Sequence, residues 1–322
     1  MLYPLVFHPI YRQRVWGGRR LASHFGRTLP PDIPIGESWE IADRPDAESV
    51  VANGPLAGRT LRWLMEQHAP ALLGEAGAHS VDGRFPLLVK ILDAQESLSL
   101  QVHPPATLAA SLGGESKAEA WHVVHAQDGA RIYAGLRAPE TRASLEAAAR
   151  EGRIAGRVQS LPAKAGDSLF IPPGRVHALG AGVMVFEVQQ NSDTTYRLFD
   201  WNRTGNDGRP RDLHVAQALA CLRYDDVTPA LSMHPPEAAH HVIVDEPGLF
   251  YTHLHRLSPG GAWQNPRPGM VVVGVANGRL RLSHPVAELA LAPGQFALVP
   301  ASLPSTQIHA EGEAVFLTAG LA

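Results

Sequence analysis

The sequence contains one cysteine among its 322 residues, and this scarcity excludes two structural classes. A lone cysteine can form neither an internal disulfide framework nor a cysteine-rich zinc site. Cys221 lies in a segment with an apolar stripe at helical spacing. We therefore interpret it as a small buried hydrophobic residue rather than a reactive thiol.

A surplus of positive charge and long apolar runs are missing as well. The chain has 28 lysines and arginines against 31 aspartates and glutamates, a formal net charge of −3. This balance indicates neither a nucleic acid nor an anionic membrane as a partner. No uninterrupted apolar run approaches the roughly 20 residues of a membrane helix. The N-terminus lacks a basic segment followed by a long apolar core, so we expect no signal peptide and a soluble, cytoplasmic protein.

Turn-forming residues, by contrast, are abundant. The 27 prolines and 30 glycines interrupt the sequence at short intervals, which is typical of many short strands joined by turns. Apolar residues make up 45% and charged residues 18%, the balance of a globular protein with a sizeable core. Helical patterns are few, and we expect helices at 60–73, 139–150 and 212–222, the last one capped by Asp212.

Three short stretches, far apart in the chain, carry side chains that can bind a metal ion. Gln101 and His103 are two residues apart, so in an extended strand they point to the same face. Glu119 follows Lys117 at the same interval, and His177 comes directly after a proline–proline–glycine turn. Imidazole nitrogens with one carboxylate oxygen suit a divalent ion such as zinc, and an incomplete protein shell leaves a position open for substrate.

The third stretch, residues 166–177, reads G-D-S-L-F-I-P-P-G-R-V-H. Its glycine, proline, glycine and histidine match every fixed position of the second motif of the cupin superfamily. The first cupin motif is met in part, because Gln101-x-His103 replaces the usual histidine pair and Glu119 comes late. The resemblance implies a jelly-roll barrel with a loop inserted between its ligand strands.

A weaker copy of the same spacing occurs near the C-terminus. Residues 294–305 read G-Q-F-A-L-V-P-A-S-L-P-S, with Ser305 where the first copy has His177. We therefore expect a mainly β protein of two cupin-like jelly-roll barrels with a small helical insertion. Residues 1–230 would form the catalytic barrel with the helical insertions, and residues 231–322 a degenerate barrel without ligands.

Two further charged residues follow the histidine motif. Glu187 lies in an apolar strand, where burying an unpaired carboxylate is costly, so a metal site or a cationic partner would explain it. Arg197 follows ten residues later and could hold a phosphate or stabilise charge developing on a sugar oxygen. A structural Glu–Arg pair that pins a hairpin explains the two residues equally well. The pair His240-His241 has no motif around it, and we interpret it as structural.

Several segments, in this order, resemble type I mannose-6-phosphate isomerase, especially its short bacterial form. The resemblance runs from about residue 5 to residue 224 and fades beyond it. The matching segments are V-W-G-G, I-G-E-S-W-E-I-A-D, F-P-L-L-V-K-I-L-D-A, L-S-L-Q-V-H-P, S-K-A-E-A-W-H-V, P-P-G-R-V-H-A-L-G and E-V-Q-Q-N-S-D-T-T-Y-R-L-F-D-W-N-R.

This resemblance implies a site and a reaction. The residues that fall on the family's functional positions are Gln101, His103, Glu119 and His177 for zinc, Arg197 for the active-site arginine, Glu187 for an acid–base glutamate, and Ser99, Lys117 and Arg197 for phosphate contacts. The implied reaction interconverts mannose 6-phosphate and fructose 6-phosphate through a cis-enediol, so the expected partner is a sugar phosphate.

The resemblance names the residues of this site but leaves alternatives for the role of each. We expect Glu187 to be the base, with His177 or a metal-bound water as the alternative, and Lys117 and Arg197 to position phosphate and offset charge. Two other functions remain open at this point: a different metal-dependent cupin enzyme, such as an Fe(II) oxygenase, or a non-catalytic sugar-phosphate binder. We expect a monomer or a weak homodimer.

Overall fold

The structure is a computed structural model that describes residues 1–75, 77, 81–205, 208–235 and 237–322. The chain divides into two compact units. The central unit comprises Tyr11–Glu37 and Leu92–Met233, and the terminal unit comprises Met1–Ile10, Ser38–Ile91 and His234–Ala322. The chain passes between the units within three strands, β1 (Ile10–Gly18), β2 (Ile35–Ile41) and β5 (Leu87–Ala94), and again at residues 233–234.

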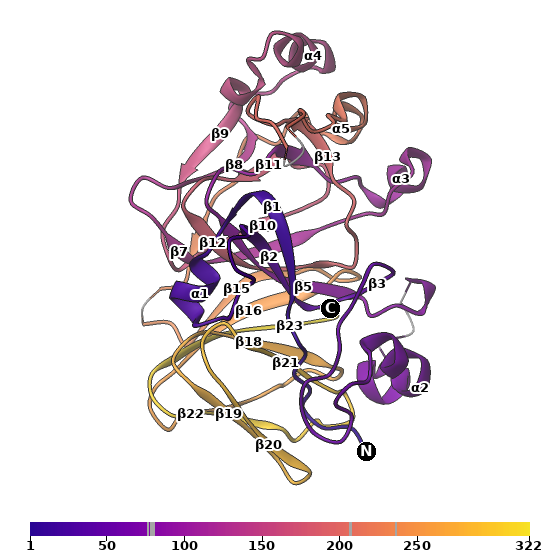
Figure 1. The fold of residues 1–322 in the computed structure, drawn as a ribbon, viewed down its shortest axis with the longest axis vertical. Coiled ribbons are helices and arrows are strands. Elements are labelled where there is room, and N and C mark those ends of the chain that lie inside the picture. Colours follow the sequence, from indigo (N-terminus) through magenta and orange to yellow (C-terminus); the bar gives the residue numbers. More distant parts are fainter. Residues whose placement is uncertain (76, 78–80, 206–207, 236) are drawn as a thin grey trace. The chain divides into compact units, whose positions relative to one another are not determined.

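The central unit is built from two sheets (Figure 1). A seven-stranded sheet contains β12, β7, β10 and β14 as successive neighbours and is completed by β1, β2 and β5, and a five-stranded sheet has the order β13-β6-β11-β8-β9. The strands are β1 (Ile10–Gly18), β2 (Ile35–Ile41), β5 (Leu87–Ala94), β6 (Leu100–Val102), β7 (Glu119–Ala126), β8 (Arg131–Leu136), β9 (Val158–Pro162), β10 (Asp167–Ile171), β11 (His177–Leu179), β12 (Val183–Gln190), β13 (Tyr196–Phe199) and β14 (Ser232–Met233).

Alternate side chains of each strand in the five-stranded sheet point to opposite faces, and both faces are covered by other parts of the unit. One face shares an apolar core with β7, β10 and β12 of the other sheet, which includes Trp121, Ile132 and Leu169. The opposite face packs against helices, with Leu145 and Leu219 among the buried side chains. The two sheets therefore enclose one interior, and the residues that face it include polar ones.

The helices of the central unit lie outside this sandwich. They are α1 (Arg20–Phe25), α3 (Ala106–Ala109), η3 (Ala110–Leu112), α4 (Arg142–Arg150), η4 (Ile154–Arg157) and α5 (Val215–Cys221). The expected helix at 139–150 starts later, at Arg142, because Thr141 caps it and forms a capping box with Ser144. The expected cap by Asp212 is wrong: α5 begins at Val215, and His214 occupies the cap position without a capping hydrogen bond from its side chain, whose Nδ1 accepts from the Arg197 amide instead.

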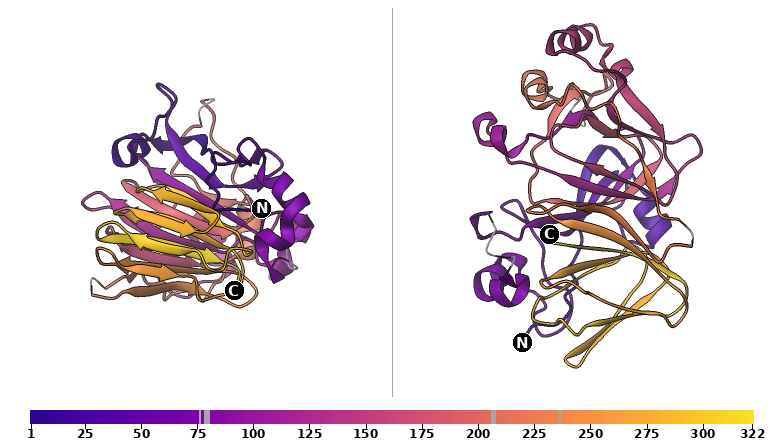
Figure 2. Two further views of the ribbon diagram at one scale, coloured as in Figure 1. Left: turned by 90° about the horizontal axis from the view of Figure 1, so that it is seen from below. Right: turned by 180° about the vertical axis from the view of Figure 1, so that it is seen from behind.

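The terminal unit contains a second two-layered β structure (Figures 1 and 2). One sheet has the order β15-β16-β23-β18-β21 and the other the order β17-β22-β19-β20. Valines of β18, leucines of β19 and Phe316 of β23 form the core between them. The strands are β15 (His240–Asp245), β16 (Tyr251–Leu257), β17 (Ala262–Gln264), β18 (Val271–Asn277), β19 (Leu280–His284), β20 (Ala287–Leu291), β21 (Phe296–Val299), β22 (Gln307–Ala310) and β23 (Ala314–Gly320).

The remaining elements of the terminal unit come from the N-terminal third of the chain. They are β3 (Asp43–Arg44), β4 (Ala47–Glu48), α2 (Leu61–Leu73) and η2 (Val81–Gly83). Helix α2 confirms the pattern at 60–73, since Thr60 caps it by accepting a hydrogen bond from the amide of Trp63.

The mainly β class predicted from the sequence is confirmed, and its strands form separate open sheets. The two-barrel description stays a prediction. The terminal unit includes residues 1–10 and 38–91 besides the C-terminal segment, and the predicted division of the chain after residue 230 stays a prediction. Within the described ranges, no helix is both long enough and apolar enough to cross a membrane.

Candidate active site

A row of three side chains crosses the inner face of the five-stranded sheet. Gln101 on β6 lies opposite His177 on β11 and opposite Arg197 on β13. Residues directly opposite one another in antiparallel strands point to the same face. The turn before β11 needs its glycine: Gly174 has a φ of 86°, and a Cβ there would lie 2.9 Å from the carbonyl oxygen of Cys221. This turn starts β11 at His177 and so directs the imidazole inward.

The other sheet supplies a carboxylate to the same place. Glu119 is the first residue of β7, and its Oε1 lies 3.1 Å from Nε2 of His103, while its Oε2 lies 3.4 Å from Nε2 of His177. One ligand atom from each of these three residues lies within 4.8 Å of the others. All three side chains are buried. Three of the four metal ligands predicted from the sequence therefore meet at one point.

The hydrogen bonds of the two histidines determine which nitrogen faces that point. Nδ1 of His103 lies 2.9 Å from the carbonyl oxygen of Thr194, and Nδ1 of His177 lies 3.0 Å from that of Arg175. A carbonyl oxygen can only accept, so both Nδ1 atoms carry the proton and both Nε2 atoms keep a lone pair. This is how metal-binding histidines are usually oriented.

The inward-facing atoms are incompletely satisfied by the protein itself. Among the residues that the structure describes, Nε2 of His103 and Oε2 of Glu119 have no hydrogen-bond partner. Two lone pairs and a carboxylate pointing at one another leave a site that a cation would complete, since an unpaired buried polar atom is costly. The residues present therefore fit a divalent metal ion such as zinc.

The charge states of these residues agree with that fit. Burial, followed by the charge of Lys117, lowers the pKa of His103 to about 3, and burial also lowers the pKa of His177. Burial tends to raise the pKa of Glu119, but Lys117 and the two imidazoles outweigh it and hold the pKa well below its usual value. At neutral pH the set is thus two neutral imidazoles and one carboxylate, the forms that bind metal.

Gln101, Ser99 and Lys117 border the cluster. The amide Nε2 of Gln101 lies 3.3 Å from Nε2 of His177, and its Oε1 accepts a 3.3 Å hydrogen bond from the Ser99 hydroxyl. Turning this amide over would present its oxygen to the cluster, because the two ends of an amide are similar in shape. Nζ of Lys117 lies 2.7 Å from Oε1 of Glu119 and is buried with it. Gln101 as a ligand stays a prediction.

The structure places Glu187 beside a tryptophan rather than in the cluster. Glu187 lies opposite Trp121 where β12 pairs with β7, and the indole Nε1 donates a 2.8 Å hydrogen bond to its Oε1. The Trp121 ring packs edge-on against the ring of His177, with centroids 5.5 Å apart. The sequence analysis missed Trp121, although its spacing of two from Glu119 places both side chains on the inner face of β7.

Arg197 lies in a region rich in guanidinium groups. Burial lowers its pKa most, and Arg211 and Arg14 lower it further, while Asp200 acts in the opposite direction. Arg211 and Arg203 both pair with the Asp200 carboxylate, at 2.6 and 2.7 Å. A further anion would relieve the repulsion between these cations, and planar guanidinium groups suit phosphate oxygens.

Fold and site together define the class of protein: a mainly β, cupin-type fold with a candidate metal centre of two histidines and a glutamate. The family model described as "Phosphomannose isomerase type I, catalytic domain" matches residues 5–135. The mannose-6-phosphate isomerase of Streptococcus mutans is 35% identical over 320 residues, which cover 98% of each chain. The chain belongs to the type I mannose-6-phosphate isomerase family, and the prediction of an enzyme of this family is confirmed.

Solved structures agree with this assignment. The crystal structure of the mannose 6-phosphate isomerase from Bacillus subtilis superposes with a TM-score of 0.87 at 29% identity, covering 99% of this chain and 100% of the other. A mannose 6-phosphate isomerase bound with zinc and yttrium shares the fold, with a TM-score of 0.76 at 18% identity, covering 99% of this chain and all of the other.

Proposed function

We propose that the protein interconverts mannose 6-phosphate and fructose 6-phosphate through a cis-enediol, with a zinc ion held by Gln101, His103, Glu119 and His177. The observation that carries this proposal is the convergence of two imidazole lone pairs and a buried carboxylate from separate sheets. All four residues lie in the central unit, so we assign catalysis to that unit.

The family relationship and the donor set both support zinc. One solved isomerase of this fold is bound with zinc and yttrium. Neutral imidazoles with one carboxylate are a common zinc-binding set. When bound, a divalent ion stabilises negative charge that develops on sugar oxygens, as a Lewis acid does.

Glu187 is the residue to which we assign proton transfer between C2 and C1 of the sugar. Its carboxylate is buried, and the Trp121 N–H fixes the orientation of Oε1. His177 is a poorer base, because its Nδ1 is held by the Arg175 carbonyl and its Nε2 faces Glu119. Its strand, β12, is buried from Val183 to Gln189, and this buried environment keeps water away from the proton that the carboxylate moves.

Arg197, Lys117 and Ser99 are assigned to substrate binding. Arg197 lies next to Gln101 in the cross-strand row and among other guanidinium groups, so a phosphate bound there would be close to the candidate centre. The ammonium of Lys117 offsets the negative charge of Glu119 and would stabilise negative charge that develops on the substrate. Holding the phosphate fixes the sugar for reaction.

A coupled isomerase assay tests the proposal. Turnover of mannose 6-phosphate should be measured before chelation, after chelation and after zinc is restored, and we expect activity, loss of activity and recovery in turn. Binding of the sugar phosphate without turnover would instead identify a non-catalytic binder. Oxygen consumption with iron, and no turnover with zinc, would identify a different metal-dependent enzyme.

A further inference from the structure

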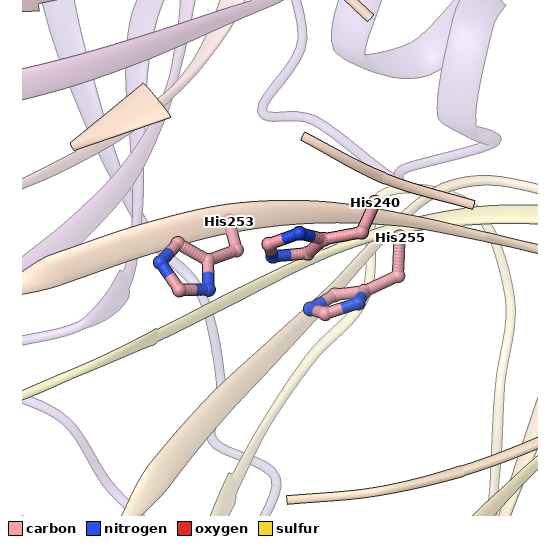
Figure 3. Close-up of side chains that lie close together, drawn as sticks. All are labelled: His240, His253 and His255. Atoms are coloured by element: carbon pink, nitrogen blue, oxygen red, sulfur yellow. The ribbon is translucent and has the colours of Figure 1, made fainter. Parts of the chain in front are cut away.

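A second group of imidazoles lies in the terminal unit, on the hairpin of β15 and β16 (Figure 3). His240 on β15 is directly opposite His255 on β16, and Val242, two residues after His240, is opposite His253. His240, His253 and His255 therefore point to one face of the sheet, and Figure 3 shows their rings gathered on the same side of the strands.

The rings are close enough to share an ion. One nitrogen from each histidine lies within 4.8 Å of the others. The His240 ring centroid is 4.8 Å from that of His253 and 5.1 Å from that of His255. His253 and His255 are buried, whereas His240 is exposed and gives access from solvent.

The hydrogen bonds around these rings leave nitrogen atoms available to bind a metal ion. Nε2 of His255 lies 2.9 Å from the Thr318 hydroxyl. If Nε2–H donates a hydrogen bond to this hydroxyl, Nδ1 keeps a lone pair that can bind a metal ion. Nε2 of His253 is buried and has no hydrogen-bond partner among the described residues, although a carboxylate oxygen of Asp245 lies 3.5 Å away. A cation bound at a buried nitrogen that lacks a hydrogen-bond partner would offset the cost of burying it.

A pocket of about 540 Å³ adjoins the three rings. Its lining includes Tyr251, Trp263 and Arg267 besides all three histidines. Arg267 pairs with Asp245 and lies over the Tyr251 ring, so its charge is already partly offset. The pocket gives room for water or an anion to occupy a fourth coordination position.

We propose that His240, His253 and His255 form a second binding site, for a divalent transition-metal ion of the zinc type. An all-nitrogen set of imidazoles selects zinc, copper or nickel over magnesium or calcium, which prefer oxygen. Burial and then the neighbouring His240 lower the pKa of His253, and the pKa of His255 falls to about 3, mainly through burial. These two rings are therefore neutral at physiological pH, as ligands must be.

The test uses the full chain, freed of metal by chelation and titrated with Zn²⁺ alone in a calorimeter. We expect two ions per chain in the wild type, and one in His240→Gln, whose second site weakens by at least about 100-fold, since even changes behind a ligand cost ten- to a hundredfold. His240 is exposed, so this replacement leaves the fold intact. His241→Gln is the matched control, because the next residue on β15 points to the opposite face, and it should keep two ions.

The same titration of Glu119→Gln separates this proposal from the isomerase centre. We expect Glu119→Gln to lose the ion of the central unit and to keep the one in the terminal unit. A single ion in the wild type that Glu119→Gln removes, or two ions retained by His240→Gln, would overturn the second site. A single wild-type ion that His240→Gln removes and Glu119→Gln keeps would support the second site and contradict the proposed isomerase centre.

Discussion

The two units each contain a cluster of imidazoles, and the clusters differ in charge and in how they are held. In the central unit a carboxylate, Glu119, joins His103 and His177, and every member is buried. In the terminal unit the set is His240, His253 and His255, with no carboxylate among them and one exposed ring. A ligand set that carries negative charge binds a divalent ion more strongly than a neutral one, because it offsets the charge of the ion.

The supports behind the rings differ as well. Backbone carbonyls of Thr194 and Arg175 orient both imidazoles of the central unit. In the terminal unit the partner of His255 is a side chain, the hydroxyl of Thr318. The backbone therefore orients the histidines of the central unit, whereas the orientation of His255 in the terminal unit depends on a side chain that a mutation can remove.

Losing a ligand should separate the two clusters most clearly. We expect His177→Gln to lower turnover of mannose 6-phosphate by about 100- to 1,000-fold, because metal and substrate binding are both disturbed. His253→Gln should change turnover by less than about twofold, because His253 belongs to the terminal unit and we assign catalysis to the central unit. Equal losses in the coupled assay would show that the clusters are not functionally distinct.

Removing the assigned base should have the next largest effect. Glu187→Gln keeps the shape and can still accept from the Trp121 N–H, so we expect about a 100-fold loss of turnover at unchanged zinc content in the central unit. Metal analysis and the coupled assay measure the two quantities, and Glu146→Gln on α4 is the control. Turnover near the wild-type level would remove Glu187 from this role.

The side-chain support of the second cluster offers a smaller, more specific test. Thr318→Val removes the hydroxyl next to His255 and should weaken zinc binding there by about ten- to a hundredfold. The lost hydrogen bond should lower the free energy of unfolding by about 1 kcal/mol. Calorimetry and denaturant unfolding measure these effects. Zinc affinity unchanged in this variant would mean that Thr318 does not orient the ring.

The lone thiol gives a reference for whether variants in either cluster remain folded. Burial raises the pKa of Cys221 to about 11, above the roughly 8.5 of an exposed thiol. The protonated thiol is therefore retained below about pH 8.5 in folded and unfolded chains alike, and in the folded chain it is lost only as pH rises through about 11. At pH 8 we expect a thiol reagent to react slowly with every folded variant and rapidly once denaturant is added. Rapid reaction in the native wild type would contradict a buried Cys221.

Much of the first site could be predicted from local sequence, and the second could not. His177 is indicated by the turn that includes Gly174, and Gln101 and His103 by their spacing of two. His253 and His255 have the same spacing, but no turn motif or family pattern accompanies them, and their third partner was interpreted as structural. The placement of Trp121 between Glu187 and His177 was missed because it depends on packing across β7, β12 and β11.

The sequence by itself determined the types of ligand, the alternation that places them on one strand face, and the glycine turn that begins β11. Tertiary structure decided which of these faces meet. Glu119 reaches His103 and His177 because two sheets close over one core, and His240 lies opposite His255 because β15 and β16 pair in one register. Both outcomes rest on pairing and packing between distant segments, whose energies come from the whole core and not from any local run of residues.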